Sequence, residues 1–179
     1  SSNIKIMTTI FYDLETTGLA RNSKIIEIAA YREDTNTYFH ELVNPGIPIP
    51  PGSSKIHKIT DPDVVSMPKI KEVLLQFNNF CQGENIILVA HNNDGFDKII
   101  LQNEYISSEI SLPSWDYLDT LKIARAVLPE LGNHKLDTLK EYYDINIGDA
   151  HLALDDVANM YQVYQKLKGD KTDLDMFNL

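Results

Sequence analysis

The beginning of the chain contains three strand-like runs joined only by short links, and this feature restricts the fold most. Each run is rich in β-branched and aromatic residues, which favour an extended backbone. The runs are Lys5–Asp13, Lys24–Arg32 and Thr37–Val43. Between the last two lies Glu33–Asn36, whose acidic, Thr and Asn residues are typical of a hairpin loop. Because short links join antiparallel strands, we expect an antiparallel meander that opens a sheet.

The rest of the chain alternates between strand-like and helical patterns. The apolar run Ile86–Ala90 is typical of a buried central strand, and Trp115–Leu118 indicates another. Apolar residues at helical spacing predict helices at Lys69–Phe80, Phe96–Tyr105, Thr120–Leu128, Lys135–Tyr143 and Leu152–Leu167. We therefore predict an α/β fold in which a mixed sheet, an antiparallel meander followed by parallel strands, is flanked by α-helices.

A proline-rich segment, Asn44–Pro68, separates the third strand from the first helix. It holds most of the eight prolines of the chain. We expect a long loop here, and a loop of this length without structure of its own is usually functional or disordered. The 179 residues fit a single domain with its motif-bearing core at about 8–167, and the tail at 169–179 is too short for a second domain.

Composition restricts the cellular setting and the partners. The single cysteine, Cys81, excludes an internal disulfide and favours a reducing intracellular compartment, cytoplasmic or nuclear. No membrane partner and no secretory signal are expected, because no apolar run is long enough. The formal net charge is −10. On charge alone a nucleic-acid partner is disfavoured, since such proteins usually carry a basic face.

Acidic residues follow two of the predicted strands. Asp13 and Glu15 lie at the end of the first strand, and residues two apart on a strand point to the same face. Asp97 follows the run Ile86–Ala90 and shares a helical face with apolar residues, so it should point inward. Asp94 is better placed as the N-cap of that helix. Taken singly, a solvated strand end or a helix-start Asp explains these acids as well as a function does.

The last helix distinguishes between two neighbouring acids. Asp156 lies on an apolar face, with Met160, Val163, Tyr164 and Leu167. Asp155 lies on a polar face, with Asn159, Gln162 and Lys166. Helical periodicity therefore predicts that Asp156 is buried and Asp155 exposed. A buried carboxylate must be paired, protonated or bound to a metal.

Inward acids and His151, without cysteine ligands, form an oxygen-rich site that suits hard cations such as Mg²⁺ or Mn²⁺. Two such ions about 4 Å apart would stabilise both the attacking and the leaving oxygen of a phosphoryl transfer. Other chemistries have little support. The chain has no G-x-S-x-G nucleophile motif and no glycine-rich phosphate loop.

Three motifs resemble those of one enzyme family. They are FYDLETTGL (Phe11–Leu19), AHNNDGFD (Ala90–Asp97) and HLALDD (His151–Asp156). Their order and spacing, and the stretch Tyr117–Leu139, are similar to the DnaQ-like DEDDh exonucleases, and HNNDGFD resembles the TREX-type branch in detail. The resemblance covers about residues 8–167. It implies a ribonuclease H-like fold and 3′→5′ removal of nucleoside 5′-monophosphates from single-stranded or frayed ends, with DNA favoured over RNA.

The resemblance also implies roles for individual residues. Asp13, Glu15, Asp97 and Asp156 would bind two Mg²⁺ ions, for which Mn²⁺ would substitute. His151 would act as the general base towards the attacking water.

Substrate-binding roles follow in the same way. The backbone around Thr16 and Thr17 would contact the terminal nucleotide, Leu19 would wedge between the last two bases, and Ile56 would pack against the terminal base. Apart from the resemblance, one interpretation of the basic residues is a rim that binds phosphates, and a solvated surface explains them about as well; these residues are Lys55, His57, Lys58, Lys98, His134 and Lys135. Asp119 is interpreted as the N-cap of the helix from Thr120.

Two alternatives stay open at this point. An RNA-directed exoribonuclease of the same family would carry the same motifs. A proofreading or docking subunit of a larger replication or repair complex is the second alternative, although a binding-only relative would be free to lose its acids. A homodimer through Thr37–Val43, if that strand forms a sheet edge, is a further option that the sequence does not decide.

Overall fold

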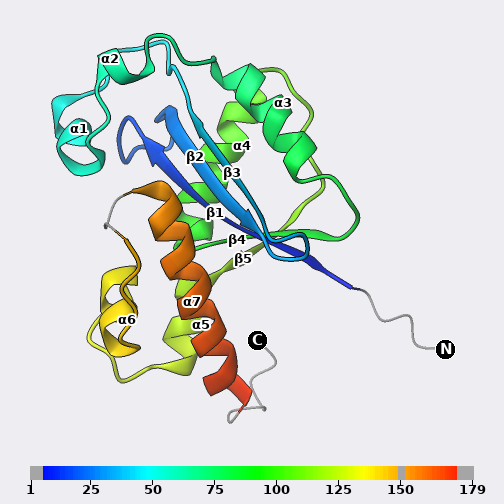
Figure 1. Cartoon of the computed structure of the whole chain (residues 1–179), viewed down its shortest axis with the longest axis vertical. Coiled ribbons are helices and arrows are strands. Elements are labelled where there is room, and N and C mark those ends of the chain that lie inside the picture. Colours follow the sequence, from blue (N-terminus) through cyan, green and yellow to red (C-terminus); the bar gives the residue numbers. More distant parts are fainter. Residues whose placement is uncertain (1–5, 149–151, 173–179) are drawn as a thin grey trace.

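A five-stranded mixed sheet forms the centre of the molecule (Figure 1). The computed structural model describes residues 6–148 and 152–172. The strands are β1 (Thr8–Thr16), β2 (Ile25–Arg32), β3 (Thr37–Leu42), β4 (Ile86–Ala90) and β5 (Asp116–Asp119). Their order is β3-β2-β1-β4-β5; β1 to β3 pair antiparallel, and β4 pairs parallel with both β1 and β5. The predicted meander followed by parallel strands is confirmed.

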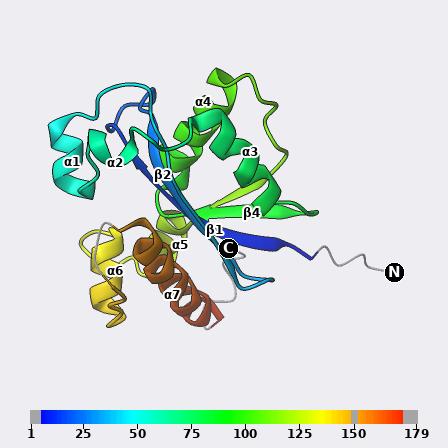
Figure 2. The same cartoon turned by 45° about the horizontal axis from the view of Figure 1, so that its top comes forward.

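Helices cover both faces of this sheet (Figure 2). On one face lie α3 (Ile70–Phe80) and α4 (Lys98–Ser107). On the other lies α7 (Ala153–Thr172), with α5 (Thr120–Val127) and α6 (Leu136–Tyr142) packed against it. Two short helices, α1 (Pro51–His57) and α2 (Asp61–Val64), follow β3. No helix in the described ranges combines the length and the apolar character needed to cross a membrane.

The central strand β1 is covered on both faces, and its alternation decides where its acids lie. The side chains of Ile10, Tyr12 and Leu14 pack in the core formed with α3 and α4. Phe11 packs in the core on the α7 side. Since successive side chains on a strand point to opposite faces, Asp13 and Glu15 continue the row that Phe11 begins. The two acids therefore face α7.

The proline-rich segment differs from the prediction, because it contains α1 and α2 instead of a loop without structure. Pro51 begins α1, where its fixed backbone angle fits the first helical turn. At α2, the Thr60 amide and hydroxyl both donate to the Asp63 carboxylate, which forms a capping box. Proline density thus indicated helix starts, and the expectation of a long unstructured loop was wrong.

The first strand extends further than the sequence suggests. β1 continues to Thr16, which pairs with Ile25 after an irregularity in register between Glu15 and Thr16. Asp13 and Glu15 thus lie within a paired strand. Strand pairing holds both backbones in place.

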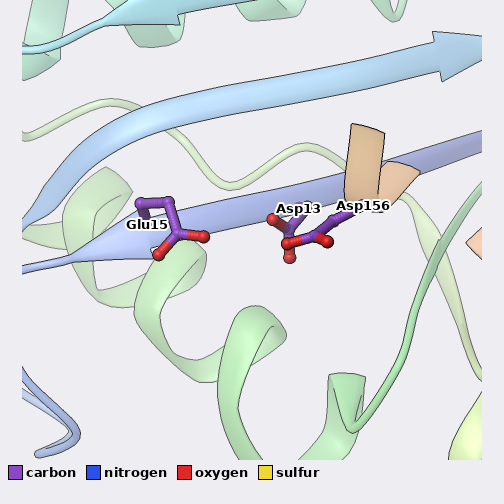
Figure 3. Close-up of side chains that lie close together, drawn as sticks. All are labelled: Asp13, Glu15 and Asp156. Carbon is purple, nitrogen blue, oxygen red and sulfur yellow. The ribbon is translucent and has the colours of Figure 1, made fainter. Parts of the chain in front are cut away.

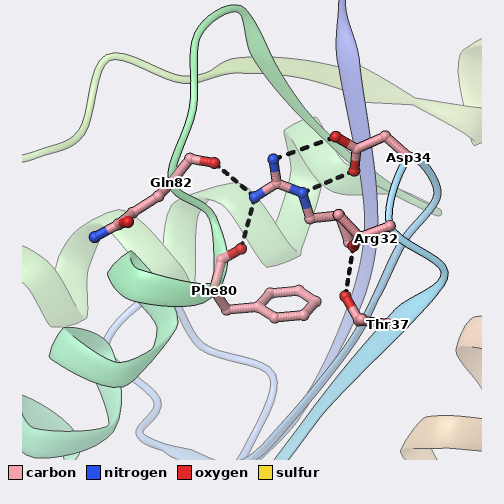
Figure 4. A network of polar contacts seen from close by, with 6 residues as sticks. Arg32, Asp34, Thr37, Phe80 and Gln82 are labelled. Atoms are coloured by element: carbon pink, nitrogen blue, oxygen red, sulfur yellow. Dashed lines mark hydrogen bonds and ion pairs between the residues drawn. The ribbon is translucent and has the colours of Figure 1, made fainter.

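Arg32 joins the sheet to the end of α3, at the opposite end of β2 from the acids (Figure 4). Its guanidinium donates to the carbonyls of Phe80 and Gln82, at 2.8 and 2.6 Å. It also pairs with Asp34 at 2.8 Å. This network ties the β2–β3 hairpin to the helical layer.

Candidate functional site

The first two acids of the site come from β1. Asp13 lies opposite Ala29 on β2, and Glu15 lies opposite Glu27. Asp13 and Glu15 are both half-buried, so the site lies at the border between core and solvent.

The third acid comes from α7. Figure 3 shows Asp156 reaching from this helix towards Asp13 and Glu15. One carboxylate oxygen from each of the three residues lies within 4.8 Å of the others. Helical periodicity explains the placement, because Val163 and Leu167 on the same face of α7 are fully buried against the core. The predicted orientation of Asp156 agrees with this geometry, but the residue is half-buried and not fully buried as predicted.

The expectation for Asp155 was wrong, because its side chain is half-buried instead of exposed. The reason is Asn159, one turn further along α7, which is fully buried. Its amide accepts from the Ile147 backbone N–H at 3.0 Å and donates to the Ile147 carbonyl at 2.9 Å. The segment before α7 therefore lies over the helical face that the sequence suggested was solvated, and Gly148 lies against Asp155.

Asp97 approaches the site from the turn after β4. This turn is a π-helix, η1 (Asn93–Asp97), that leads directly into α4. Asp97 is 5% exposed, which agrees with the predicted inward orientation. Its carboxylate lies outside the group of three, but its charge raises the pKa of Asp13. Asn93, at the start of the turn, is held by Tyr12 and by the Leu88 carbonyl.

Asp119 fixes the start of that turn. Its carboxylate accepts from the backbone amides of Asn92, Asp94 and Leu121, at 2.9, 3.1 and 2.9 Å. The bond to Leu121 confirms the predicted N-cap of α5, and the other two join the α5 start to η1. The prediction that Asp94 is an N-cap was wrong: Asn92 occupies that position, and Asp94 pairs with Lys122.

The acids raise one another's pKa values. Burial, followed by the charges of Asp156, Glu27 and Asp97, raises the pKa of Glu15 to about 8. Burial also raises the pKa of Asp97 to about 8, although hydrogen bonds from the backbone amides of Asp97 and Leu14 lower it. Burial raises the pKa of Asp13 well above its usual value.

One oxygen of the cluster has no hydrogen-bond partner among the residues that the structure describes. Asp13 Oδ2 is buried and has no hydrogen-bond partner in the structure. A buried carboxylate oxygen without a donor is costly. A divalent cation would satisfy this oxygen and relieve the repulsion, so the donor set fits a hard metal ion.

We expect the metal-free protein to lose stability as the pH rises towards 8. The carboxyls of Glu15 and Asp97 titrate near pH 8 when folded and near 4.5 and 3.8 when unfolded. The folded state therefore holds more protons between these values, and the free energy of unfolding falls with rising pH. Added divalent ions bind the ionised carboxylates, so they should raise Tm more above pH 8 than in mildly acidic buffer.

Thermal unfolding across this pH range, with chelator and with divalent ion, measures this effect. Each kcal/mol shifts Tm by about 2–4 °C in a domain of this size. Glu15→Gln should flatten the metal-free profile, because it removes one titrating group. An unchanged slope in this variant would contradict the assignment.

A pocket of about 400 Å³ adjoins the acids at Glu15. Thr16, Thr17 and Leu19 line one side, and Ile56 of α1 lines the other. Thr16 Oγ1 donates to the Gly18 carbonyl, the Lys24 amide donates to Thr17 Oγ1, and Ser53 Oγ donates to the Thr17 carbonyl. These bonds hold the turn rigidly, and the structure thus brings the four predicted substrate-binding residues to one pocket.

Two apolar side chains of this pocket are exposed. Leu19 is 87% exposed and Ile56 is 55% exposed. Large apolar side chains at the mouth of a pocket gain stability when a ligand covers them. They suit an aromatic, flat ligand group better than a charged one.

The predicted basic rim is not one surface. His57 is 4% exposed, and its Nδ1 accepts from the Ile59 amide. The hydrogen therefore lies on Nε2, which is buried and has no hydrogen-bond partner among the described residues. Lys98 lies over the ring of Tyr117. His134 is bound through Nε2 to the Leu128 carbonyl. Burial and local bonding thus remove these side chains from a shared rim.

His151 lies outside the described residues. Glu27 was missed by the sequence reasoning: it is 8% exposed, lies opposite Glu15 and binds His40 Nε2 at 2.7 Å. A charged residue inside the apolar run Ile25–Arg32 was the available signal.

The sequence also matches a known family across most of its length. Residues 10–164 match the exonuclease family RNase_T. The chain belongs to this family. Within it, the chain belongs to the DnaQ-like branch and has a ribonuclease H-like fold, as the motifs indicated. Exonucleases of this family depend on divalent metals, in agreement with the acid cluster.

Curated relatives are similar over most of this chain. It is 39% identical to the exonuclease DPD1, chloroplastic/mitochondrial, of Arabidopsis thaliana, over 93% of this chain and 58% of the relative. It is 38% identical to the DNA polymerase III subunit epsilon of Treponema pallidum, over 81% of this chain and 69% of that one. A PolC-type DNA polymerase III of Streptococcus agalactiae is 34% identical over 84% of this chain, which spans 10% of its length.

Solved structures support the fold. Exonuclease I of E. coli in complex with a dT13 oligonucleotide superposes with a TM-score of 0.85 at 19% identity, over 96% of this chain and 43% of that one. Exonuclease X in complex with 5′ overhanging duplex DNA gives 0.72 at 24% identity, over 90% and 91%.

Proposed function

We propose that this protein is a metal-dependent 3′→5′ exonuclease that acts on single-stranded or frayed DNA ends and releases nucleoside 5′-monophosphates. The observation that carries the proposal is the convergence of Asp13, Glu15 and Asp156 beside the pocket of Thr16, Leu19 and Ile56. Similarity to an epsilon subunit supports the 3′→5′ direction. The oligonucleotide bound to the related fold of exonuclease I supports a DNA substrate.

The acids would hold two Mg²⁺ ions, with Mn²⁺ as a substitute. Asp13, Glu15 and Asp156 supply the oxygens, and Asp97 lies next to them. Bound divalent ions lower the pKa of water and stabilise the charge of a phosphodiester under attack. In a chain with a net charge of −10, they would also offset the repulsion between acids and substrate phosphates.

The pocket would hold the 3′-terminal nucleotide. The rigid turn at Thr16 and Thr17 would place backbone groups against the sugar, while Leu19 and Ile56 would cover the base. A volume of about 400 Å³ lies within the range of small-ligand pockets. A terminal nucleotide held in this pocket would place its phosphodiester beside the acids, and this is the bond that an exonuclease cuts.

His151 would take the proton from the attacking water. We expect His151→Ala to lower kcat by about 100-fold or more, in the range typical of general bases, with little change in substrate affinity. Steady-state rates and oligonucleotide binding in chelator measure the two effects separately. An equal loss in rate and affinity would contradict the general-base role.

Product analysis tests the proposal as a whole. Single-stranded DNA and RNA oligomers of one sequence, labelled at the 5′ or the 3′ end, are digested with Mg²⁺, with Mn²⁺ and with chelator. We expect labelled mononucleotide from the 3′-labelled DNA at once and a ladder of shortened products from the 5′-labelled DNA. Faster digestion of the RNA would favour the exoribonuclease alternative, and mononucleotide release from the 5′ end would contradict the proposed direction.

A further inference from the structure

A second pocket, with basic residues, opens beyond the ends of β4 and β5. It has a volume of about 460 Å³. Its lining includes His91, Arg125, His134 and Lys135. In a chain with a net charge of −10, such a gathering of basic side chains in one pocket is unexpected for a purely solvated surface.

The two histidines of this pocket are bound within the protein. His91 Nε2 donates to the His134 carbonyl at 2.6 Å, and its Nδ1 accepts from Thr120 Oγ1 at 2.8 Å. Burial lowers the pKa of His91, which keeps the ring neutral. His134 donates to the Leu128 carbonyl. The imidazoles therefore build the wall of the pocket and leave little capacity for a ligand.

Arg125 and Lys135 differ from the two histidines. Both side chains are exposed, and within residues 6–148 and 152–172 neither forms an ion pair. The neighbouring Lys122 differs, because Asp94 neutralises it. Two free cations thus share a pocket whose wall is fixed by internal hydrogen bonds.

The position of this basic pocket relates it to the acids. It includes Asn92, the residue that precedes the π-helical turn carrying Asp97. In the sheet, β4 and β5 lie on one side of β1. The first pocket is formed by α1 together with the turn that follows β1. Figure 1 shows α1 and α6 on the same side of the molecule, with the start of α7 between them. The two pockets therefore flank the acid cluster.

We propose that Arg125 and Lys135 bind a backbone phosphate of the substrate strand, upstream of the bond that is cut. This inference rests on the proposed function. A strand with its last nucleotide in the first pocket passes the acids and continues towards β4 and β5. The Arg guanidinium offers paired donors that match phosphate oxygens, and the Lys ammonium adds a mobile charge.

The test compares Arg125→Gln/Lys135→Gln with a matched double variant, Lys71→Gln/Lys166→Gln, which removes the same charge from exposed positions on α3 and α7. The substrates are a single-stranded DNA oligomer and the p-nitrophenyl ester of thymidine 5′-monophosphate, which has no upstream phosphate. We expect the pocket variant to raise KM for the oligomer about tenfold, as removal of a charge-assisted hydrogen bond would. Its ester hydrolysis and its kcat should match those of the control variant.

Salt dependence and direct binding provide a second readout. The slope of log Kd against log salt, measured in chelator by fluorescence anisotropy, should fall in magnitude by about 0.7 for each phosphate that the variant no longer binds. Unchanged KM, Kd and slope relative to the control would overturn the inference. An effect confined to duplex DNA would also overturn it, because the pocket would then bind the other strand. Failure of the unmodified protein to hydrolyse either substrate would contradict the proposed function instead, and the binding measurement would still test the pocket.

Discussion

Asp156→Asn is expected to reduce metal-dependent release of mononucleotides by more than about 100-fold. Loss of a residue that merely supports a metal ligand already costs about 10–100-fold. Asp156 supplies one of three carboxylate oxygens within 4.8 Å of one another, so Asn removes a charge from the metal site itself without changing the shape of the side chain. The measurement is the initial rate on a 3′-labelled single-stranded oligomer over a range of Mg²⁺ concentrations.

The neighbouring acid provides the control. Asp155→Asn makes the same chemical change one position earlier, on the helical face that lies against Gly148, and should retain most of the activity. In chelator, Asp156→Asn should unfold at a Tm no lower than that of the unmodified protein, because its charge raises the pKa values of Asp13 and Glu15. Activity of Asp156→Asn within tenfold of the parent, or equal losses in both variants, would contradict the proposed metal site.

Asp119→Ala is expected to lower the free energy of unfolding by about 1–3 kcal/mol, the cost of losing an N-cap and the charged acceptor of three backbone amides. Its carboxylate accepts from three backbone amides, at Asn92, Asp94 and Leu121. Alanine leaves these donors without the acceptor that joins η1 to α5. Urea-induced unfolding followed by circular dichroism measures the loss.

A graded substitution separates the capping role from a general effect of charge. Asp119→Asn keeps a carbonyl oxygen and should cost less than Asp119→Ala. Asp137→Ala, at an exposed acid in the first turn of α6, should change stability by less than about 0.5 kcal/mol. Because the cap holds the turn that carries Asp97, Asp119→Asn should also weaken metal binding. Equal stability of the Asp119 and Asp137 variants would show that the cap is not needed.

Periodicity predicted the framework of the site because it reports burial. The run Ile86–Ala90 became β4 with unchanged bounds, and the apolar face of the last helix identified Asp156 as the acid beside β1. Local patterns are sufficient where one face of an element is fully covered. The motif resemblance added the prediction that these acids lie together in one site, because they come from separate stretches of the sequence.

Contacts between distant segments account for what the sequence did not reveal. The exposure of Asp155 was mispredicted because Asn159 binds Ile147 across a turn. His57 was assigned to a surface rim, but α1 buries it against the pocket. Glu27 was overlooked because its neighbours, Glu15 and His40, come from other strands. Each depends on tertiary packing, which local periodicity does not encode.

The packing of α7 on the sheet also sets when activity can arise during synthesis. Asp13 is made early, Asp97 near the middle and Asp156 close to the end of the described chain. α7, which carries Asp156, covers one face of β1 and β2 through Val157 and Met160. A growing chain emerging from the ribosome therefore has only part of the acid set and an uncovered sheet. Under the proposed function, the acid set is complete only once α7 has docked on the sheet, so cleavage cannot begin before that step.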